Sequence, residues 1–243
     1  MLDEKLKMLG NTLLYYSCNI QEGDKVLIEA TKNCGDLVKY LINKCYAAKA
    51  IPFVILKETD IKRELILGGN QEQFELMAKS QNILMNEMDV YIEITEYDNF
   101  CELHDIPIEK RQLFQKYFIQ SVYKDKNINR WVTVGYPTKS MAQRFGMSTD
   151  SFEKFYFSVV NQDYKELSKK MQALTEYMDK ARIVQIIAPK TNLTFDIGGM
   201  TSFVCDGKIN LPDGEVFIAP NKYTANGIIT FNVDSLYQGY NFS

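Results

Sequence analysis

One carboxylate stands at a defined point of the segment NLPDGEVFIAPN, which runs from Asn210 to Asn221. Glu215 follows a Pro-Asp-Gly turn and begins an apolar run that is typical of a strand. Proline fixes φ and glycine accepts positive φ without steric cost, so this turn presents the next side chain in a defined place. A metal ligand needs such rigid support, and Glu215 is therefore a candidate metal ligand. The alternative is a hairpin turn that ends in a solvated glutamate.

The histidine content restricts the remaining mechanisms. His104 is the only histidine, in the acidic stretch NFCELHDIPIEK. No metal site can therefore take two histidine ligands from this chain. A serine-histidine-aspartate triad would need His104 and a nucleophile elbow, and the sequence contains no such elbow. We interpret His104 as a loop imidazole near Glu102 and Asp105, and we assign no catalytic residue.

Other cofactor and metal patterns are absent. The segment ATKNCGDL follows the first expected strand and has neither the G-x-G-x-x-G spacing nor a Walker loop, so no cofactor-binding residues are predicted. The cysteines are scattered and form no C-x-x-C pair, which favours reduced thiols in the cytoplasm over disulfides or a thiolate zinc site. They are Cys18, Cys34, Cys45, Cys101 and Cys205.

The length and composition indicate a chain that can form a core, and they argue against nucleic acid and membrane as partners. The chain has 243 residues, 46% of them hydrophobic, which is enough for a substantial core in one large domain or two small ones. Its 28 basic and 31 acidic residues are spread evenly and give a net charge of -3, so no electrostatic footprint for nucleic acid is present. No run of eighteen apolar residues occurs, and we predict neither a signal peptide nor a membrane span.

The helices and strands expected from the sequence form two regions of different character. As far as about residue 146, apolar strand patterns alternate with helical ones, which predicts a mostly parallel sheet flanked by helices. The expected strands are at 26–30, 51–57, 89–96 and 130–137, with helices between them and a break near Gly68 and Gly69. After Pro137 helical patterns follow one another, and from Ile183 the apolar period becomes two, as in half-exposed antiparallel strands.

We therefore predict an α/β fold in three parts. Residues 1–146 form an α/β N-terminal domain, residues 147–182 form connecting helices, and residues 183–243 form a β-rich region of α+β character. No internal repeat or low-complexity linker separates the parts.

Three ordered segments resemble one protein family. NLPDGEVFIAP with NGIITF resembles the signature of the thermophilic metalloprotease family, which includes aminopeptidase T, aminopeptidase S and PepS. INRWVTVGYPTKSMAQRFGMSTDSFEKFYF and NIQEGDKVLIEA are similar to two earlier segments of that family. The resemblance implies removal of N-terminal amino acids from peptide substrates with two divalent metal ions, usually zinc, cobalt or magnesium. It also implies a homodimer, and it makes Glu215 a metal ligand.

The sequence departs from the family pattern in its remaining ligands. In longer family chains a second glutamate, two histidines, a tyrosine and an aspartate follow the signature. Four aspartates near Glu215 match no ligand motif: Asp196, Asp206, Asp213 and Asp234. We therefore expect residues 183–243 to be an incomplete start of the catalytic domain and the chain to be inactive alone. Two alternatives stay open, a non-catalytic binding or scaffold protein that kept the fold and a stand-alone α/β ligand-binding domain. An interrupted β-domain would also expose a strand edge and apolar faces and so favour self-association.

Overall fold

The computed structural model describes residues 3–96, 98–124 and 128–231. The chain divides into two compact units. The first comprises Met1–Asp163 and Gly207–Asp213, and the second comprises Tyr164–Asp206 and Gly214–Ser243. Within the described residues, no helix is both long enough and apolar enough to cross a membrane.

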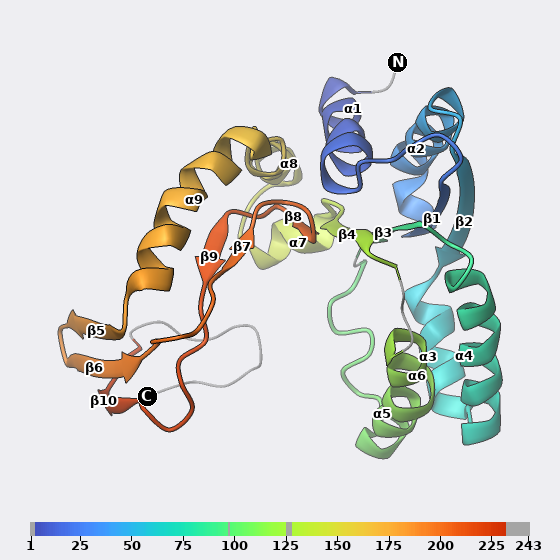
Figure 1. Cartoon of the computed structure of the whole chain (residues 1–243). Helices are drawn as coiled ribbons and strands as arrows, with labels where there is room; N and C mark the ends of the chain where they lie inside the picture. Colours follow the sequence, from blue (N-terminus) through green and yellow to red (C-terminus); the bar gives the residue numbers. More distant parts are fainter. Residues whose placement is uncertain (1–2, 97, 125–127, 232–243) are drawn as a thin grey trace. The chain divides into compact units, whose positions relative to one another are not determined.

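A five-stranded parallel sheet forms the centre of the first unit (Figure 1). The strand order is β2-β1-β3-β4-β8, and every neighbouring pair is parallel. The predicted mostly parallel α/β sheet is thus confirmed. The strands are β1 (Lys25–Thr31), β2 (Ile51–Lys57), β3 (Val90–Thr95), β4 (Arg130–Gly135) and β8 (Asn210–Leu211).

One face of this sheet is apolar in its central strands except at Arg130, the first residue of β4. Its fully buried side chains include Val26, Ile28, Val90, Ile92 and Val132. The helices α1 (Glu4–Asn11) and α2 (Gly35–Ala47) and the π-helical turn η1 (Thr12–Ser17) belong to the same unit. They add the buried leucines Leu9, Leu13, Leu14, Leu37 and Leu41 to its core. This face follows the usual rule that parallel strands bury continuous apolar runs.

A second helical group follows β2 in sequence. Its elements are α3 (Thr59–Gly68), α4 (Gln71–Met85), α5 (Ile108–Phe114), the π-helical η3 (Gln115–Ile119) and α6 (Gln120–Lys124). Phe74 packs edge-on against Phe114, and Phe114 stacks on Phe118, with centroid distances of 5.2 and 4.8 Å. The predicted break between helices falls at Gly69, where Asn70 takes over as N-cap and accepts a hydrogen bond from the Gln73 N–H.

The first unit ends with two short helices, α7 (Lys139–Arg144) and α8 (Thr149–Val160). Thr138 and Ser148 cap them with side-chain oxygens, as their residue types favour. The second unit begins with α9 (Tyr164–Lys180) and then carries two small antiparallel sheets. One contains β5 (Ile183–Ala188), β6 (Thr191–Asp196) and β10 (Asn226–Ile228), and the other pairs β7 (Phe203–Cys205) with β9 (Glu215–Phe217).

Candidate metal centre

Glu215 is the first residue of β9, in the second unit. It lies opposite Cys205 in the antiparallel β7–β9 pair, and Val216 and Phe217 extend the same pairing. Its side chain is exposed, and the part of the chain that the structure describes gives it no hydrogen bond or ion pair. Its carboxylate is therefore held on a paired strand with its oxygens open to a ligand.

The backbone before Glu215 explains the glycine at position 214. Gly214 has a φ of 142°, a conformation that side-chain-bearing residues rarely adopt. A Cβ at this position would also lie 3.2 Å from Leu167 Cδ2 on α9. The positive φ agrees with the sequence-based expectation that a glycine in this turn adopts a conformation that other residues disfavour.

The first half of the segment serves the parallel sheet of the first unit. Asn210 and Leu211 form β8, which pairs with Thr133 and Val134 of β4. The Asn210 side-chain amide donates to the Pro212 carbonyl oxygen at 3.3 Å, which ties the turn to the strand end. The segment that we interpreted as one turn and one strand therefore supplies a strand to each unit.

The described aspartates that could act as additional ligands accept hydrogen bonds from nearby protein groups. Asp196 accepts hydrogen bonds from the Gly198 N–H at 2.6 Å and the Asn221 amide at 3.0 Å. These two bonds, with a smaller contribution from Arg182, lower the pKa of the Asp196 carboxyl despite the opposing effect of desolvation. The Asp196 carboxylate thus serves as the local anchor of a turn.

Asp206 and Asp213 form no ligand set with Glu215 among the described residues. Asp206 is buried and accepts a hydrogen bond from the Ser168 hydroxyl at 2.9 Å. Asp213 accepts one from the Gly207 N–H at 3.0 Å, which stabilises the loop before Gly214. Asp234 lies outside the described residues.

These donors do not by themselves fit a two-metal centre. Among residues 3–96, 98–124 and 128–231, no group of three or more His, Cys, Asp and Glu side chains could hold a metal ion. Each divalent ion in such a centre takes at least four ligands, several of them from protein. Among the described residues, Glu215 therefore has no partner side chains with which to complete such a centre.

His104 lies in the turn between β3 and α5. Its side chain is exposed, and its backbone N–H donates to the Cys101 carbonyl oxygen at 2.9 Å. The neighbouring acids pair with an arginine instead, since Arg63 lies 2.8 Å from Asp105. In the part of the chain that the structure describes, His104 therefore joins no group of candidate metal ligands.

A cluster of polar residues at the carboxyl edge of the sheet was not predicted from the sequence. Glu96 is buried just after β3 and accepts hydrogen bonds from Thr31 Oγ1 at 2.5 Å and Asn33 Nδ2 at 3.1 Å. Burial raises the pKa of Glu96; Asp98 adds to the rise, and the two hydrogen bonds oppose it. Thr31, Glu96 and Asp98 line a pocket of about 230 Å³ where the strand order reverses between β1 and β3. A glutamate that ends the apolar run VYIEITE was the available signal.

Comparison with solved structures identifies a shared fold. Wild-type AmpT from Thermus thermophilus matches with a TM-score of 0.71 at 18% identity, over 92% of this chain and 63% of that chain. This chain therefore spans less than two thirds of the AmpT chain. CurK enoyl reductase has a TM-score of 0.28 at 12% identity, over 71% of this chain and 49% of its own. A TM-score this low does not indicate that CurK and this chain share a fold or a function. No curated protein matches the sequence significantly.

Comparison with protein families covers nearly the whole chain. The description of the matching family is thermophilic metalloprotease (M29), and the match runs over residues 2–242. It includes the segment around Glu215 and both earlier segments on which the resemblance depended. This chain belongs to the thermophilic metalloprotease (M29) family.

Proposed function

We propose that the protein is a metal-dependent aminopeptidase that removes N-terminal amino acids from peptides, and that Glu215 is one ligand of its two divalent metal ions. The observation that carries this proposal is the presentation of the Glu215 carboxylate, exposed and without a described partner, at the first residue of β9. The membership of the chain in a metalloprotease family supports it. The ions would be zinc, cobalt or magnesium.

The division of labour along the chain belongs to the same proposal. Residues 1–146 form the N-terminal α/β domain, residues 147–182 connect it, and residues 183–243 carry Glu215 as the start of the catalytic domain. All five cysteines are thiols, which supports a reducing compartment such as the cytoplasm. The protein would act as a homodimer on peptide substrates.

Metal content of the complete gene product tests the role of Glu215. After dialysis against zinc and then buffer, we expect Glu215→Gln to lose about half or more of the bound metal, because the amide oxygen is a much weaker ligand than a carboxylate. Glu176→Gln, an exposed acid on α9, is the matched control and should keep the wild-type metal content. Elemental analysis measures the metal, and leucine p-nitroanilide measures hydrolysis.

Different outcomes separate the parts of the proposal. Residues 1–243 expressed alone should release no amino acid, because the described residues hold no complete metal set. Equal metal content and activity in wild type and Glu215→Gln would remove Glu215 from the site. A complete gene product that binds no metal and hydrolyses no peptide would instead establish the alternative, a binding or scaffold protein that kept the family fold.

A further inference from the structure

The second face of the parallel sheet carries polar residues at one level across four strands. Glu29 of β1 is in register with Glu93 of β3, Glu93 with Thr133 of β4, and Thr133 with Asn210 of β8. Central strands of a parallel sheet usually present apolar side chains on both faces. Two neighbouring glutamates at one level are therefore unusual here, and packing of the sheet does not by itself explain them.

Glu29, the glutamate on β1, is paired with a lysine. Glu29 is only 2% exposed and forms an ion pair with Lys57 Nζ. It also accepts hydrogen bonds from the Tyr91 hydroxyl at 3.1 Å and the Gln81 amide at 3.4 Å. A buried carboxylate is stable only with such partners, so Lys57 is committed to Glu29.

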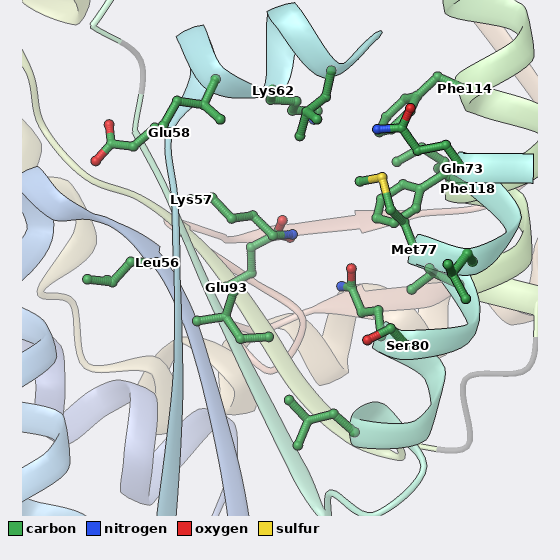
Figure 2. A pocket seen from close by; sticks show the side chains of 18 residues that line it. Leu56, Lys57, Glu58, Lys62, Gln73, Met77, Ser80, Glu93, Phe114 and Phe118 are labelled. Carbon is green, nitrogen blue, oxygen red and sulfur yellow. The ribbon is translucent and has the colours of Figure 1, made fainter. Parts of the chain in front are cut away.

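A pocket of about 780 Å³ opens beside this ion pair (Figure 2). Its walls come from the end of β2, from α3 and α4, and from the segment of α5, η3 and α6. Most of the lining is apolar and includes Met77, Leu84, Phe114 and Phe118, whereas Lys57, Lys62 and Glu93 contribute charge. This size and this mixture of apolar wall with few polar groups are typical of small-molecule sites.

Lys62 is a lysine of this pocket that forms no ion pair with a described residue. Its Nζ lies over the Phe114 ring, 5.6 Å from the centroid, and the described residues offer it no hydrogen bond or ion pair. Burial and the nearby Lys57 lower the pKa of the Lys62 ammonium, and the carboxylates of Glu29 and Glu93 only partly oppose this fall. An anion placed beside Lys62 would stabilise its charged form and offset this fall in pKa.

The acids of the pocket wall are engaged elsewhere. Glu58 lies 3.4 Å from Lys32, and Glu93 Oε2 accepts a hydrogen bond from Thr133 Oγ1 at 3.1 Å. Glu93 faces the pocket with its other oxygen unassigned to any described donor. The pocket thus combines an apolar wall with an ammonium that has no ion pair among the described residues, and the Glu93 carboxylate disfavours ligands with more than one negative charge.

We propose that this pocket binds a small amphipathic monocarboxylate, with its carboxylate on Lys62 and its apolar chain against Met77, Leu84 and Phe118. The shared chemistry is one carboxylate on an apolar body, which a medium-chain fatty acid or an apolar amino acid could supply. In the second case the amino group would lie toward Glu93. The site is in the first unit, and it does not depend on the proposed peptidase activity.

Isothermal titration with octanoate, octylamine and leucine tests the pocket. Octanoate should bind, and octylamine should bind about tenfold more weakly or not at all, because its ammonium faces Lys62. Lys62→Met should weaken octanoate binding by about tenfold or more, since it removes a charge-assisted hydrogen bond and keeps the apolar stem. Lys79→Met, an exposed lysine on α4, is the control and should bind as wild type.

Two further variants complete the test. Ser80→Trp lies at an exposed position of the pocket wall and should abolish binding by filling the space, with an unchanged melting temperature as the check on folding. If leucine binds more tightly than octanoate and Glu93→Gln weakens leucine alone, the natural ligand is an amino acid; the reverse order indicates a fatty acid. No binding of either acid, or binding that survives Lys62→Met or Ser80→Trp, overturns the proposal.

Discussion

Gly214 and Glu215 are neighbours with separate physical roles. The glycine allows a backbone conformation with φ of 142°, and the glutamate that follows begins a paired strand. A side chain can be presented reproducibly only if the backbone that carries it is restrained. The proposed metal ligand therefore depends on a residue that has no functional group.

Replacement of this glycine should destabilise the protein. Gly214→Ala puts a Cβ at positive φ and 3.2 Å from Leu167, and we expect a loss of about 1–2 kcal/mol in the free energy of unfolding. Gly68→Ala is the control, because a Cβ at this last residue of α3 would meet no atom within 4 Å and the φ angle is not positive. Urea unfolding measures both variants, and equal stabilities would show that a side chain at position 214 causes no backbone strain.

Among the elements, a partly buried ion pair connects the strands β1 and β4 at their amino ends. Arg130, the first residue of β4, donates to both carboxylate oxygens of Asp24, at 2.7 and 2.8 Å. Asp24 immediately precedes β1, and β3 lies between these two strands in the sheet. The bidentate geometry joins elements that are far apart in sequence, and such pairs are the stronger kind of charged hydrogen bond.

The Asp24–Arg130 pair should give stability a defined dependence on pH. Burial alone would raise the pKa of Asp24, but the hydrogen bonds from Arg130 and the Gln21 N–H lower it below its usual value. A depressed carboxyl pKa stabilises the folded state above the unfolded pKa of about 4, and this contribution is lost as the pH falls through the folded pKa. Arg130→Met should cost about 2–3 kcal/mol at pH 7, and the difference from wild type should shrink below about pH 4.

Urea unfolding between pH 3 and pH 7 measures this difference. Arg111→Met on α5 is the matched control, because this exposed arginine has no described ion pair. A gap between Arg130→Met and wild type that stays constant down to pH 3 would mean that Asp24 does not titrate as part of the pair.

At the scale of the whole molecule, the two units differ in how much apolar surface they bury. Among described residues, the buried apolar side chains of the second unit are only Tyr164, Met171 and Ile197. Many of its strand residues are exposed instead, among them Ile183, Ile187, Phe203, Phe217 and Ile228. Exposed apolar strands with open edges favour association between copies.

We expect residues 1–243 to self-associate through the second unit. Ile187 is 75% exposed on β5, an edge strand of the three-stranded sheet, so Ile187→Lys should shift the protein toward monomer by placing a charge on that edge. Ile83→Lys, at a similarly exposed position of α4 in the first unit, should leave the distribution unchanged. Light scattering after size exclusion measures the mass, and a monodisperse wild-type monomer would contradict the expectation.

The local patterns of the sequence determined much of the fold and the family. Four of the five strands of the parallel sheet, β1 to β4, were predictable because each is a compact apolar run between helical patterns, and local periodicity records such elements. The segment around Glu215 was recognisable because a Pro-Asp-Gly turn and its neighbours are adjacent in sequence. The helix break at Gly69 followed from residue types alone.

Only the tertiary structure decided which distant residues meet. Nothing local indicates that Asn210 and Leu211 add a strand to a sheet formed much earlier in the chain, because strand pairing over such a separation has no local signal. The same holds for Glu29 and Glu93, which are single acids in separate apolar runs until register places them side by side. The pocket beside Lys62 forms only because α3, α4 and the sheet come together around one space. The sequence by its local patterns determined most helices and strands and the family. The packing of those elements determined which charged side chains come together and which form no ion pair.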